Sequence, residues 1–137
     1  MSLYPRRPGA AAYQQTAVHG GVAAADPHRL VLMLMDGALE RLAAAKGAIA
    51  NGSMETKARM IQRTMAIVDE LRSSLNREAG GEIATNLDAL YDYFGRQLVR
   101  ANLENRVELL DEVANLMREI RSAWILMPGA AARAATP

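Results

Sequence analysis

Leu30-Val31-Leu32-Met33-Leu34-Met35-Asp36-Gly37-Ala38-Leu39 is the stretch of sequence that decides the fold. In a helix, at about 100° per residue, its apolar side chains divide into two stripes. The first has the spacing of a core-facing surface and comprises Leu30, Val31, Leu34, Ala38, Leu42 and Ala45. The second, on the far side, comprises Leu32, Met35 and Leu39. Because one bundle core needs only about 100° of apolar surface, the excess must be covered by another segment of the chain, a second subunit or a partner's peptide.

The composition is that of one small domain. The 137 residues contain no cysteine, which excludes disulfides and thiolate metal sites and fits a reducing cytosol. Sixteen basic and fifteen acidic residues leave a net charge of +1, which argues against nucleic acid as a partner. The six apolar residues from Leu30 to Met35 are far fewer than the roughly 20 of a membrane span. With no targeting peptide evident, we expect a cytosolic protein without membrane insertion.

The ends of the first predicted helix are marked by local signals. Residues 1–25 hold two prolines and three glycines, and they predict a flexible N-terminal arm that has room for a short helix around Tyr13. Asp26 and Pro27 have the residue types of an N-cap and a first helical position. The helix should run to about Ile49, where Asn51 and Gly52 end it.

Three further amphipathic helices follow. The second should begin after Ser53 and end at Gly80-Gly81, and the third should end in a turn over 102–105. The fourth should end before Pro128, leaving residues 128–137 as a short disordered tail. Four helices of about 20 residues with short connections predict an all-α, antiparallel up-down four-helix bundle over residues 26–127. Its core should include Leu34, Leu87, Phe94 and Trp124.

Tyr91 and Tyr93 lie beside the core stripe of the third helix, and Tyr93 falls well off it. Such rings suit the rim of a groove, with the apolar ring covered and the hydroxyl in water. Tyr91 by itself fits equally well at the boundary of the core.

The sequence contains no recognisable catalytic site or metal site. The two histidines, His19 and His28, precede or open the first helix, so the ligand set of a di-iron bundle is missing. Glu108 and Asp111 form a lone acidic pair on a solvated face. No glycine-rich phosphate loop follows a strand, and no serine has a histidine partner within the bundle. We therefore predict a binding protein with no enzymatic activity and no cofactor, whose eight methionines suit a surface that accepts varied helices.

Several short motifs occur in a fixed order along most of the chain. They are Tyr13-Gln14-Gln15, the run from Leu32 to Leu39, Gly80-Gly81-Glu82-Ile83-Ala84-Thr85-Asn86-Leu87, Leu90-Tyr91-Asp92-Tyr93, Ala101-Asn102 and Trp124. In this order and spacing they resemble the FliS family of flagellar secretion chaperones, the cytosolic chaperones of flagellin. The family usually has tyrosine where this chain has Met35, so a hydroxyl is lost at that point.

The resemblance implies a bundle that binds the disordered C-terminal segment of flagellin in apolar surface grooves. Such a chaperone prevents premature polymerisation in the cytosol and delivers its client for export, with a component of the flagellar export gate as a further partner. The N-terminal arm is expected to cover part of the binding surface in the free chaperone. The resemblance places client contacts at Tyr13, Leu32, Met35, Leu39, Asn86, Tyr93 and Arg96.

The alternative is a structural homodimer in which the second apolar stripe is a permanent subunit interface. A chaperone should be a monomer or a weak homodimer without its client, whereas the structural module should form a stable dimer.

Overall fold

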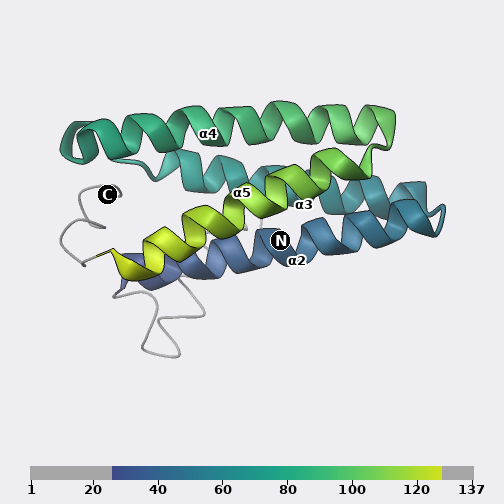
Figure 1. The fold of residues 1–137 in the computed structure, drawn as a ribbon, viewed down its shortest axis with the longest axis horizontal. Coiled ribbons are helices and arrows are strands. Elements are labelled where there is room, and N and C mark those ends of the chain that lie inside the picture. The colour runs from purple at the N-terminus through teal and green to yellow at the C-terminus, as the bar shows by residue number, and fades with distance from the viewer. Residues whose placement is uncertain (1–25, 128–137) are drawn as a thin grey trace, which may run out of the picture.

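The computed structural model describes residues 26–127, which form four helices and no strand. The helices are α2 (Pro27–Ala50), α3 (Met54–Ser73), α4 (Arg77–Glu104) and α5 (Val107–Leu126). They alternate in direction, each packs against the next, and α5 returns to pack on α2 (Figure 1). This arrangement confirms the predicted antiparallel four-helix bundle. The predicted arm over 1–25 and tail over 128–137 lie outside the described residues.

The bundle has two distinct ends. The end at which α2 and α4 begin and α3 and α5 finish is called the entry end below (Figure 1). At the opposite end, α2 turns into α3 and α4 turns into α5. No helix within residues 26–127 combines the length and the apolar character needed to cross a membrane.

The predicted boundaries of α2 are confirmed. The Asp26 carboxylate accepts a hydrogen bond from the backbone N–H of Arg29 at 3.3 Å, and Pro27 occupies the first helical position. Asn51 caps the other terminus, and Gly52 follows with a φ of 74°, a conformation that glycine adopts without steric cost.

The prediction that the second helix runs up to Gly80-Gly81 is wrong, whereas the predicted break in helical conformation is present at Gly81. Helix α3 already ends at Ser73, and the Asn76 side chain caps α4 by accepting from the Ala79 N–H at 3.0 Å. The glycine pair therefore lies inside α4, where Gly81 has φ 54° and ψ −127° and kinks the helix. The predicted turn over 102–105 is also too long, because α4 continues through Glu104 and only Asn105 takes a left-handed conformation.

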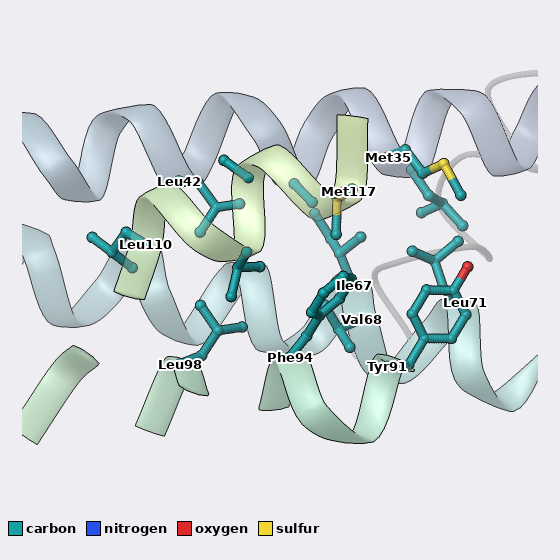
Figure 2. Close-up of a cluster of buried hydrophobic side chains, with 14 of the residues drawn as sticks. Met35, Leu42, Ile67, Val68, Leu71, Tyr91, Phe94, Leu98, Leu110 and Met117 are labelled. Carbon is teal, nitrogen blue, oxygen red and sulfur yellow. The ribbon is translucent and has the colours of Figure 1, made fainter. Parts of the chain in front are cut away.

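All four helices contribute side chains to one core, and the ten residues labelled in Figure 2 meet between the helices. Leu34, Phe94 and Trp124 are buried as predicted, whereas Leu87 is half-buried and packs against the core from its edge. Tyr91 is also buried, which settles its position inside the core rather than on a groove rim, and this burial raises the pKa of its phenol.

The prediction that Met35 lies on an outward stripe is wrong, because this side chain is fully buried among core residues of the other helices (Figure 2). The physical reason is that α2 packs against both α3 and α5, and two neighbours need a wider apolar arc than one. Leu32 and Leu39 are half-buried and pack against the same core. By helical periodicity they share the side of α2 on which Asp36 binds Arg121 of α5. Most of the apparent excess of apolar surface is therefore covered within the bundle.

Candidate functional site

A groove between α4 and α5 opens at the entry end of the bundle. It has a volume of about 250 Å³ and is called the α4–α5 groove below. Its lining residues are apolar except for one amide side chain, and they are Ile83, Asn86, Leu87, Ile120, Ala123, Trp124 and Met127. The groove is therefore an apolar binding surface that carries a single polar group.

Helical spacing and helix direction together build this groove. Its lining positions recur at three- and four-residue steps, so each helix presents one continuous stripe to it. Toward the entry end, α5 crosses to lie close to the start of α2, while α4 lies on the far side of the bundle (Figure 1). The two stripes therefore diverge instead of closing on each other. Ile83 consequently remains 42% exposed although it belongs to the apolar stripe of α4.

Trp124 forms the part of the groove wall that is continuous with the core. Its residue is buried, and its indole N–H donates to the backbone oxygen of His28 at 3.0 Å. The His28 ring stacks on the indole with centroids 5.4 Å apart and planes 10° from parallel. The first turn of α2 therefore packs against the Trp124 side chain that forms this wall.

Further along the α4–α5 interface, a polar cluster joins the two helices. The Tyr93 hydroxyl donates to Glu112 Oε2 at 2.6 Å, and the Gln97 amide donates to Glu112 Oε1 at 2.9 Å. These two hydrogen bonds, the Tyr93 one foremost, lower the pKa of the Glu112 carboxyl, and the same bond raises the pKa of Tyr93. The cluster joins α4 to α5 through residues that lie outside the groove lining.

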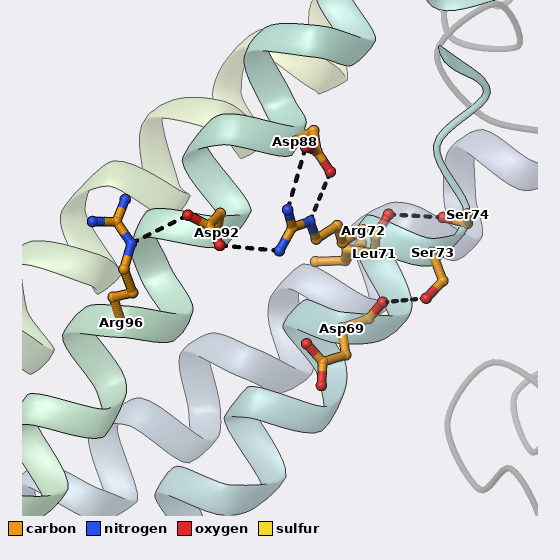
Figure 3. Close-up of polar contacts among 8 residues, drawn as sticks. All are labelled: Asp69, Leu71, Arg72, Ser73, Ser74, Asp88, Asp92 and Arg96. Atoms are coloured by element: carbon orange, nitrogen blue, oxygen red, sulfur yellow. Dashed lines mark hydrogen bonds and ion pairs between the residues drawn. The ribbon is translucent and has the colours of Figure 1, made fainter. Parts of the chain in front are cut away.

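A chain of ion pairs crosses from α3 to the outer side of α4 (Figure 3). Arg72 donates to Asp88 at 2.7 Å and to Asp92 at 3.2 Å, and Asp92 also accepts from Arg96 at 3.1 Å. The bond to Asp88 is the main cause of the raised pKa of Arg72. Arg96 also lies over the Tyr93 ring, 5.8 Å from its centroid, so the outer surface of α4 is ordered by local charge contacts.

The residues predicted as client contacts within residues 26–127 lie on two helices, α2 and α4. Asn86 lines the α4–α5 groove, while Tyr93 and Arg96 lie further along α4. Leu32, Met35 and Leu39 lie on α2 and do not line the groove. Tyr13 lies outside the described residues.

Sequence reasoning missed most of the groove residues because it assigned their stripes to the core. Ile83, Ile120 and Trp124 do follow the core spacing of their helices, and the sequence carries no signal that α4 and α5 diverge there. Among residues 26–127, no group of three or more histidine, cysteine, aspartate or glutamate side chains is placed to hold a metal ion.

A four-helix bundle that leaves an apolar groove open between two of its helices belongs to the class of helical binding proteins. The family model described as flagellar protein FliS matches residues 9–130 of the chain. The flagellar secretion chaperone FliSB of Pseudomonas aeruginosa is 46% identical over 112 residues, covering 82% of this chain and 89% of the relative.

Two further relatives carry the name flagellar secretion chaperone FliS. The Vibrio cholerae protein is 43% identical over 117 residues, covering 85% of this chain and 86% of its own length. The Salmonella typhimurium protein is 41% identical over 117 residues, which cover 85% of this chain and 87% of the relative. The chain belongs to the FliS family of flagellar secretion chaperones. The family is one of chaperones rather than enzymes.

Proposed function

We propose that this chaperone binds the C-terminal segment of flagellin and that the α4–α5 groove receives part of that segment. The observation that carries the proposal is the groove itself, an open apolar groove with a volume of about 250 Å³ at one end of the bundle. The volume is below the roughly 300–1,000 Å³ of small-molecule sites and suits the anchor side chains of an amphipathic helix. Asn86 offers the amide that would hydrogen-bond the backbone of the bound segment.

The role follows from the chemistry of the client. The terminal helices of flagellin polymerise by burying apolar stripes, so a chaperone that occupies those stripes in the cytosol prevents premature filament formation. Because the client orders as it binds, part of the contact energy, about 2–5 kcal/mol, is consumed. Binding then stays reversible enough for delivery to the flagellar export gate, the second partner of this proposal.

The proposal extends from the groove along α4 to Tyr93 and Arg96, whose half-buried ring and exposed guanidinium follow Asn86 on that helix. It omits Met35, which has no exposed surface to offer. Tyr13 stays a prediction, as does coverage of the surface by the arm.

Two isoleucine variants test the groove. Ile83 lines it and is 42% exposed, whereas Ile125 is 47% exposed and lies outside its lining. In calorimetric titrations with a peptide of about the last forty residues of flagellin, we expect wild type to bind one to one with a negative heat-capacity change. Ile83→Asp should weaken binding by about tenfold or more, and Ile125→Asp should leave it near the wild-type value. Equal effects of the two substitutions would place the client elsewhere.

A structural homodimer remains the second candidate, and one observation favours it. Val99 and Leu103 lie one helical turn apart on α4, near the end opposite the groove, and are 44% and 76% exposed. Sedimentation of the free protein separates the two functions. A monomer over the micromolar range supports the chaperone, whereas a concentration-independent dimer that binds no flagellin peptide supports the homodimer.

A further inference from the structure

The first turn of α2 and the last turn of α5 are fastened to each other by three contacts between His28 and Trp124. The His28 Nε2–H donates to the Trp124 backbone oxygen at 2.5 Å, and the indole N–H donates to the His28 backbone oxygen at 3.0 Å. The imidazole also stacks on the indole. Each residue thus uses its side chain to bond the other's backbone, and we call this pair the His28–Trp124 clasp.

Trp124 belongs to this clasp and to the α4–α5 groove at the same time. It lines the groove between Ala123 and Met127, while its indole nitrogen and one ring face are engaged by His28. His28 itself does not line the groove. The orientation of the groove wall is therefore set by a residue on a helix that does not otherwise contribute to the site.

We propose that His28 is a positioning residue for the groove. The clasp holds the indole in the one orientation that keeps the wall continuous from Ile120 to Met127, and it links occupancy of the groove to the first turn of α2. A ligand that contacts Trp124 in the groove also affects His28 through the stacked rings. Conversely, a substitution of His28 changes the orientation of the Trp124 indole in the groove wall. The nature of the occupant rests on the function proposed above, whereas the link between His28 and the wall does not.

The test compares His28→Ala and His28→Phe with Arg29→Ala in the full chain. His28→Ala removes the stack and the bond to the Trp124 oxygen, His28→Phe keeps an aromatic stack, and Arg29 is an exposed neighbour. Because Trp124 is the single tryptophan, indole fluorescence excited at wavelengths that tyrosine does not absorb reports on it alone. A titration with the flagellin C-terminal peptide then measures binding.

We expect His28→Ala to change the indole signal and to weaken peptide binding by about tenfold, with helix content unchanged. His28→Phe should recover most of the affinity, and Arg29→Ala should match wild type in both measurements. If His28→Ala loses helix content, His28→Phe carries the test. It must then retain the indole signal and bind more tightly than His28→Leu, which has no ring to stack.

Two results would overturn the proposal. One is an affinity equal to wild type in His28→Ala although the indole signal has changed. The other is a loss of affinity with an unchanged indole signal, which would mean that His28 acts by another route. If wild type itself does not bind the peptide, the proposed function fails. The positioning role is then decided by the indole signal alone, and an unchanged signal in His28→Ala overturns it.

Discussion

At the scale of single residues, the burial of Met35 depends on how many helices its own helix touches. Its side chain lies in the core because α2 packs against α3 and α5 together, and the unbranched thioether fills the space among core residues of other helices. Met33, two positions earlier, is only half-buried and does not join the core cluster. Two methionines of one short run thus have different roles.

This difference predicts that alanine substitutions of the two methionines lower the free energy of unfolding by unequal amounts. Met35→Ala should lower the free energy of unfolding by about 2–5 kcal/mol, because it leaves a cavity in a packed core. Met33→Ala should change that free energy by only about 0.5 kcal/mol. Urea unfolding followed by circular dichroism measures both. Similar midpoints for the two variants would contradict the assignment of Met35 to the core.

At the scale of helices, the kink at Gly81 sets how α4 begins. Asn76 caps the helix ahead of the glycines, and the positive φ of Gly81 then redirects the chain just before Ile83 and Asn86 reach the groove. A side chain at that backbone conformation is strained whatever space surrounds it. Gly47 of α2 differs, since its backbone is helical and a methyl group there would meet open space.

The two glycines therefore predict opposite responses to the same substitution. Gly81→Ala should destabilise the protein by about 1–3 kcal/mol through backbone strain. Gly47→Ala should stabilise it by about 0.5–1 kcal/mol, because alanine loses less backbone entropy in a helix. Thermal unfolding of both variants checks the signs. A stabilising Gly81→Ala would mean that α4 can run straight through this position.

The sequence could predict helices wherever the signal is local. Asp26 with Pro27 marks the start of α2, and Asn51 with Gly52 marks its end, because caps and turns involve only neighbouring residues. The Asn76 cap was overlooked because the glycine pair after it is the stronger breaker signal. The groove could not be predicted, since it depends on the divergence of α4 from α5, and Ile83 has the same spacing as a core residue.

At the scale of the whole molecule, the Glu112 cluster makes stability depend on pH. Hydrogen bonds from Tyr93 and Gln97 hold the pKa of Glu112 in the folded protein below its ordinary value of 4.5. The unfolded chain therefore takes up this proton at higher pH than the folded protein does. The stabilisation is present above about pH 4.5 and is lost as the pH falls through the folded pKa.

We expect Glu112→Gln to lose less stability than wild type on acidification from about pH 6 to about pH 3. Tyr93→Phe, which removes one donor and leaves Gln97 in place, should show an intermediate loss. Urea midpoints measured across this pH range show how steeply the stability of each variant falls with pH. If the urea midpoints of wild type and Glu112→Gln fall in parallel as the pH is lowered, the cluster does not cause the loss of stability in acid.

The antiparallel arrangement also decides where this protein can be modified for experiments. The start of α2 and the end of α5 meet at the entry end, beside the groove. The exposed turn of Asn51, Gly52 and Ser53 lies at the other end of the bundle. A cysteine introduced at Ser53 would be the only thiol in the chain. It would carry a fluorophore or a surface tether at the end of the bundle opposite the α4–α5 groove.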